Sequence, residues 1–173
     1  MKKFTETTMY KKGDIGEKIV DDIIENNPDI LCYAPITDGS HPVDRIVMSR
    51  DKREMMIVEV KTLNARDFYP DTGISIDHYN QYKYLQEKYC MNVQLVFVDE
   101  RKGKVYGNLI DELDKEIVVK HNGRDIVYPH NKYNSYATGE YIRYFALDSM
   151  KEIRDLTEEE ILEIRKYSNR RGA

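Results

Sequence analysis

Apolar residues recur along this chain with helical and with strand-like spacing, and the two spacings separate its predicted elements. Isoleucine stands at every fourth position from Ile15 to Ile23, which makes one apolar face of a helix. Near the end of the chain, Thr157 and Glu160 have the spacing of a capping box, which marks the start of another helix. The predicted helices cover residues 14–26, 78–89 and 157–167.

The middle helix carries most of its large side chains on one side. Tyr82, Leu85 and Tyr89 follow a helical stripe, and we interpret them as core packing. Ser75 and Asp77 are both suitable N-caps for this helix.

Shorter runs rich in β-branched residues predict strands. A polar turn at residues 50–53 separates two of them, which makes a hairpin. Residues 66–77 are predicted to form a loop, and Asn122-Gly123 a tight turn. The predicted strands are 43–49, 54–61 and 93–98, with further β structure between 117 and 147. The pattern as a whole predicts a mixed α/β fold.

The strand at residues 54–61 carries two charges where a buried strand normally has none. Because side chains alternate along a strand, Glu59 and Lys61 lie on the same face. If the hairpin turns on Asp51-Lys52, Asp44 of the preceding strand is directly opposite Glu59, and opposite residues of an antiparallel pair share a face. The sequence therefore predicts Asp44, Glu59 and Lys61 together on one face of the sheet.

These three charged side chains suggest a metal-binding or catalytic role more than a structural one. Two carboxylates whose β-carbons are only ~5 Å apart repel each other. A hard divalent cation between them removes the repulsion, because carboxylate oxygens are its preferred ligands. A lysine beside such a cation suits an anionic substrate. The combination favours hydrolysis of phosphodiesters.

Composition narrows the class of protein further. The chain has 173 residues, 40% of them hydrophobic, which predicts a single domain over residues 1–173. Its 31 acidic and 27 basic residues argue against a surface coated in positive charge but leave room for a local basic groove. Two cysteines without a CxxC pair favour a reducing compartment. Neither a signal peptide nor an apolar run of ~20 residues is present, so a cytoplasmic protein is expected, with no membrane as partner.

Asp44, followed across a short hairpin by Glu59-Val60-Lys61, resembles the D…(D/E)xK signature of the PD-(D/E)XK nuclease superfamily, the restriction-endonuclease-like fold. The resemblance covers about residues 14–98. It implies a core of order α-β-β-β-α-β, with a central mixed β-sheet flanked by helices, and makes residues 99–173 a C-terminal β/α elaboration. The motifs are more similar to the resolvase-like and exonuclease-like branches than to any one restriction enzyme. The proline of the signature stands one residue early, at Pro42.

The resemblance also implies roles for residues outside the hairpin. The first helix of many members contributes a glutamate, and Glu17 lies at the edge of the apolar face, where it could do so. The second helix often directs a glutamine toward the site, and Gln81 would be its counterpart. Lys61 would orient or help to deprotonate the attacking water. The implied ligands of one Mg²⁺ or Mn²⁺ are Asp44, Glu59, the backbone carbonyl of Val60 and Glu17.

The function so implied is that of a metal-dependent nuclease that cuts DNA, duplex or branched, with RNA and a homodimer both left open. The alternative is a protein of the same fold that binds nucleic acid or a protein partner without cleaving. A third interpretation is an interaction domain whose acids are an incidental surface feature. The complete set Glu17, Asp44, Glu59 and Lys61 favours catalysis, since a degenerate copy would usually have lost a member.

Overall fold

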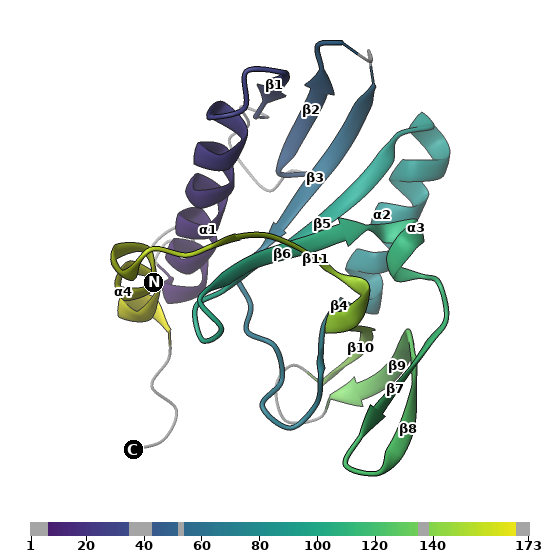
Figure 1. The fold of residues 1–173 in the computed structure, drawn as a ribbon. Coiled ribbons are helices and arrows are strands. Elements are labelled where there is room, and N and C mark those ends of the chain that lie inside the picture. The colour runs from purple at the N-terminus through teal and green to yellow at the C-terminus, as the bar shows by residue number, and fades with distance from the viewer. Residues whose placement is uncertain (1–6, 35–42, 52–53, 135–138, 169–173) are drawn as a thin grey trace.

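The computed structural model describes residues 7–34, 43–51, 54–134 and 139–168. Its centre is a six-stranded sheet made of β1 (Ile30–Tyr33), β2 (Arg45–Ser49), β3 (Met55–Lys61), β5 (Asn92–Asp99), β6 (Lys104–Leu109) and β11 (Lys151–Asp155). The strands lie in the order β1-β2-β3-β5-β6-β11 (Figure 1). The sheet is mixed, because β3 and β5 are parallel whereas the other neighbours are antiparallel.

Helices pack on both faces of this sheet. On one face, α1 (Thr8–Glu25) and α4 (Glu158–Tyr167) enclose a cluster of valines from the strands, including Val47, Val58 and Val60. The other face packs against α2 (Ile76–Tyr89) and the short α3 (Ile110–Leu113) through Ile57, Leu95 and Phe97, among others. The alternation predicted for β3 is therefore observed. In the part of the chain that the structure describes, no helix is long and apolar enough to cross a membrane.

The remaining strands form two smaller sheets, seen in the lower part of Figure 1. In the first, β10 (Glu140–Ala146) lies between β4 (Asp71–Ser75) and β9 (His130–Asn134). The second is a hairpin of β7 (Ile117–His121) and β8 (Arg124–Tyr128). Its turn is the predicted Asn122-Gly123, and both residues have the positive φ angles that such a turn requires.

Several strands were not predicted from the sequence, among them β1, β4 and β11. β1 has only four residues and lies at an edge of the sheet, so its pattern is too short to stand out. β4 falls in the predicted loop 66–77, which is wrong for residues 71–75. Its sequence DTGIS is polar, yet four of its five residues are buried against β10 and the core. Along the chain, α1 is thus followed by the meander β1-β2-β3, then by β4, α2 and β5.

Two helices begin before their predicted first residues: α2 at Ile76 in place of residue 78, and α1 by a larger margin. α1 begins at Thr8, six residues before residue 14, because its exposed first turns lack apolar periodicity; Thr7 caps it by accepting a hydrogen bond from the backbone N–H of Tyr10. Ser75 is the N-cap of α2. The predicted capping box of α4 is present, with both hydrogen bonds made.

A glycine in the middle of α1 sets how closely this helix approaches the sheet. A β-carbon at Gly16 would lie 1.9 Å from Oγ1 of Thr62, the residue that follows β3. Only glycine allows this approach without displacement. The next residue, Glu17, contacts Arg45 at the start of β2.

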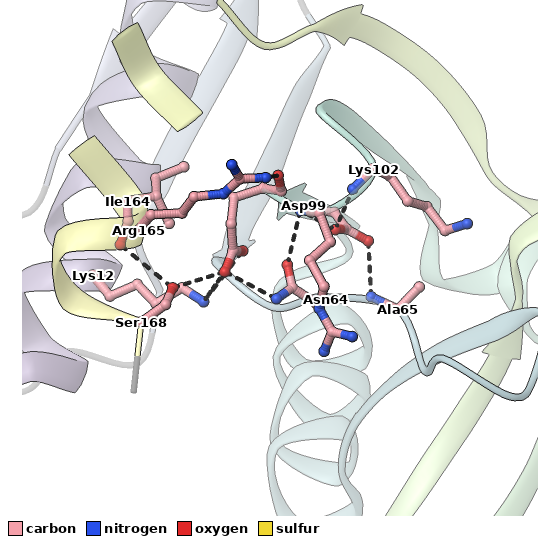
Figure 2. A network of polar contacts seen from close by, with 10 residues as sticks. Lys12, Asn64, Ala65, Asp99, Lys102, Ile164, Arg165 and Ser168 are labelled. Atoms are coloured by element: carbon pink, nitrogen blue, oxygen red, sulfur yellow. Dashed lines mark hydrogen bonds and ion pairs between the residues drawn. The ribbon is translucent and has the colours of Figure 1, made fainter. Parts of the chain in front are cut away.

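Two buried acids at the end of β5 join segments that are far apart in the sequence (Figure 2). Glu100 accepts hydrogen bonds from Lys12 of α1, Asn64 and Ser168. Its neighbour Asp99 accepts hydrogen bonds from backbone N–H groups, including that of Ala65, and from the Tyr106 hydroxyl. This network ties the start of α1, the segment after β3 and the end of α4 to one point.

Candidate active site

The hairpin β2–β3 has the register that the sequence predicted. Arg45 pairs with Val58 and Ile46 with Ile57, so Asp44, one residue before β2, comes opposite Glu59. Asp44 is held there by a hydrogen bond, because its Oδ2 accepts the backbone N–H of Val60 at 2.8 Å. The two carboxylates therefore meet on the face that packs against α2.

Glu59 is a buried carboxylate, with 5% of the residue exposed. Its Oε1 accepts two hydrogen bonds of 2.5 Å, one from Nζ of Lys61 and one from the Tyr82 hydroxyl. Its Oε2 is also buried, and within the described residues it has no hydrogen-bond partner. A buried carboxylate oxygen without a donor is costly, so this atom is suited to bind a cation.

Electrostatics at Asp44 point the same way. The pKa of Asp44 is raised from its ordinary 3.8 to about 6, first by burial and then by the charge of Glu59, against the opposing hydrogen bond from the Val60 N–H. Glu17 contributes a smaller repulsion and Lys61 a smaller attraction. The site thus holds more negative charge than its protein donors compensate, and a divalent cation would compensate it.

Glu17 reaches this region from the opposite side of the sheet. Its Oε2 lies 3.2 Å from Nη1 of Arg45, which also binds Asp21 of α1 through two hydrogen bonds of 2.5 and 2.6 Å. The same guanidinium donates to the carbonyl of Asp44 at 2.6 Å. Glu17 is therefore near the carboxylate pair but bound to an arginine. Nothing in the sequence pattern pointed to Arg45 as the link.

The structure places Gln81 at the surface of α2. Gln81 is exposed, and no interaction in the described part of the chain joins it to Glu59 or Asp44. The neighbouring Tyr82 contacts the site instead. The sequence stripe placed Tyr82, Leu85 and Tyr89 in the core; the first two are buried, whereas Tyr89, at the end of the helix, is 53% exposed. A stripe predicts burial of a tyrosine ring but says nothing about the partner of its hydroxyl.

The donor set fits a divalent cation that takes part of its coordination from the backbone. Within the residues that the structure describes, no three Asp, Glu, His or Cys side chains gather closely enough to hold a metal ion. Asp44 and the free Oε2 of Glu59 supply two carboxylates, which suits Mg²⁺ in particular because it usually binds one or two and keeps several waters.

Comparisons with known proteins found one distant structural similarity and no related sequence family. No protein-family model matches it, and none of the curated proteins does. Among solved structures it is similar to Hjc, a Holliday junction resolvase from Archaeoglobus fulgidus, with 12% identity and a TM-score of 0.43 over 63% of this chain and 80% of that one. The likeness is distant, and the case for the chain's chemistry rests on its own side-chain geometry.

Proposed function

We propose that this protein is a metal-dependent nuclease that hydrolyses phosphodiester bonds of DNA. The observation that carries the proposal is the buried pair Asp44 and Glu59, with Lys61 beside it and with one Glu59 oxygen that has no donor among the described residues. A purely structural pair would have its oxygens satisfied by protein donors. The pattern D…ExK that these residues form supports the same function.

Asp44, Glu59 and the carbonyl of Val60 would hold one Mg²⁺ or Mn²⁺. When bound, the cation supplies charge neutralisation at the phosphate and increases the acidity of the attacking water. Glu17 would assist through water or by holding a second ion, once it is released from Arg45. Gln81 is exposed on α2 and is not one of the proposed metal ligands.

Lys61 has the role that the two acids cannot fill. Its ammonium group, which donates a hydrogen bond to Glu59, has three N–H donors and can orient a water for attack at phosphorus. The water oxygen forms a bond to phosphorus and gives up a proton to solvent. The bond between phosphorus and the ester oxygen breaks, and that oxygen takes up a proton. The lysine also offsets the charge that grows on the phosphoryl oxygens.

The proposal is tested by incubating the purified protein with plasmid, linear and branched DNA in Mg²⁺, in Mn²⁺ and in EDTA. Cleavage should require the metal and should be lost in Glu59→Gln. Asp111→Asn is the matched control, since this exposed acid on α3 pairs with Lys83 away from the carboxylate pair. Equal cleavage by Glu59→Gln and the wild type, or cleavage in EDTA, would contradict the proposal.

The same experiment separates the alternative function. A protein that shifts DNA in a gel but leaves it intact under every metal condition would be a nucleic-acid-binding protein of nuclease-like design. The Glu17–Arg45 ion pair supports this alternative, because a glutamate that is paired with an arginine is not available to assist a metal ion. Cleavage of RNA in place of DNA would keep the chemistry and change the substrate.

A further inference from the structure

Tyr82 is buried next to the proposed metal ligands and has a polar contact that packing does not require. Only 2% of the residue is exposed, and its ring lies in the cluster formed by α2 and the sheet. The hydroxyl donates to Oε1 of Glu59 at 2.5 Å. Burial and the charge of Glu59 both raise the pKa of Tyr82, so the hydroxyl stays protonated and remains a donor.

The ring of Tyr82 is held on more than one side. His78, one turn earlier on α2, stacks on it with ring centroids 6.1 Å apart and an angle of 23° between the rings. Nζ of Lys61 lies 5.7 Å from the centre of the same ring. Tyr82 therefore contacts both the carboxylate and the lysine of the proposed site.

The two donors to Oε1 differ in mobility. The tyrosine is enclosed by the core, whereas the Lys61 side chain is 24% exposed and ends a flexible stem. If Lys61 turns toward a phosphate or a water, Tyr82 still satisfies Oε1. The carboxylate then keeps its orientation, with Oε2 as the atom that faces away from both donors.

We propose that Tyr82 is a positioning residue, which fixes Glu59 through Oε1 so that Oε2 is presented to a divalent cation, and which leaves Lys61 free to act on the substrate. The inference rests on the proposed function, since it concerns the same metal centre. It gives α2 a part in the site, as the family resemblance implied for Gln81, but through a different side chain and an indirect contact.

Tyr82→Phe removes the hydroxyl and keeps the ring. Loss of a hydrogen-bonding partner behind a metal ligand typically weakens metal affinity or activity by about 10- to 100-fold. We expect the Mg²⁺ and Mn²⁺ concentrations at half-maximal thermal stabilisation to rise by about 10-fold or more. Cleavage at low metal should fall in parallel and recover as the metal concentration is raised.

Tyr106→Phe is the matched control. It also removes a buried tyrosine hydroxyl that donates to a buried carboxylate, but that carboxylate is Asp99 at the end of β5. Both variants should lose some stability without metal, and only Tyr82→Phe should lose metal affinity. Calorimetric titration with Mn²⁺ at low temperature gives the same affinity if a variant melts early.

Three outcomes of these measurements decide whether Tyr82 positions Glu59 for metal binding. A raised metal midpoint in Tyr82→Phe alone supports the inference. A wild-type midpoint in Tyr82→Phe overturns it and leaves the proposed nuclease standing, because Tyr82 then only packs. A wild-type protein that shows no response to either metal overturns the metal centre and the role of Tyr82 together.

Discussion

Replacing Gly16 by alanine tests how α1 is seated beside the proposed site. The added β-carbon would lie 1.9 Å from Oγ1 and 3.1 Å from Cβ of Thr62. Threonine is stiff about χ1, so a change of its rotamer is itself costly. Either Thr62 changes rotamer or the helix, and Glu17 with it, moves away from the sheet.

The size of the effect follows from two opposing contributions. Overpacking in a well-packed core destabilises by about 1–3 kcal/mol, and a contact this short belongs at the upper end. Alanine in a helix interior stabilises by roughly 1 kcal/mol relative to glycine. We expect Gly16→Ala to lower the free energy of unfolding by about 2 kcal/mol.

Gly13 provides the control within the same helix. A β-carbon there would meet nothing within 4 Å, so Gly13→Ala has only the helical contribution and should raise stability by up to about 1 kcal/mol. Urea unfolding followed by circular dichroism measures both variants, which should differ by about 3 kcal/mol. If the two alanine variants are equally stable, the close seating of α1 on Thr62 is refuted, and with it the reason for placing Glu17 near the carboxylates.

Three further changes test the charges. The pKa of Asp44 is about 6 in the folded protein and 3.8 ordinarily, so in EDTA the free energy of unfolding should fall as the pH rises from about 4 to about 6. Asp44→Asn should remove this trend and stabilise the metal-free protein by up to about 3 kcal/mol at neutral pH. Urea unfolding at several pH values measures both effects. Lys61→Ala should slow cleavage by about 10²–10³-fold while leaving the metal midpoint unchanged or slightly lower, since an ammonium is no metal ligand; loss of metal binding would make Lys61 structural. Glu100→Ala should lower the free energy of unfolding by about 2–4 kcal/mol in the same urea assay, because its half-buried donors lose their acceptor. An unchanged urea midpoint would contradict the network.

The parts of the site that the sequence predicted are those fixed by local geometry. The period of two along β3 and the short hairpin were enough to put Asp44 opposite Glu59, with Lys61 on the same face. No information from elsewhere in the chain is needed for this. The same holds for the capping box of α4 and for the Asn122-Gly123 turn.

The parts that were missed depend on partners far away in the sequence. β4 is polar but becomes a buried strand because β10, about 70 residues later, pairs with it. Gln81 and Tyr82 differ by 100° around α2, and the helix pattern alone does not show which of them meets β3. The contact between the Tyr82 hydroxyl and Glu59 spans 23 residues and depends on how α2 is rotated on the sheet.

The network around Glu100 has a consequence for how the protein opens. Lys12 near the start of α1 and Ser168 at the end of α4 both donate to this one carboxylate, and the two helices share a hydrophobic cluster. Segments joined in this way open as a cooperative unit. The slowest amide protons of α1 and α4 should therefore exchange with solvent together, although about 130 residues separate the two helices. Because Glu17 is on α1, its position beside Arg45 then depends on the packing of α4 as well.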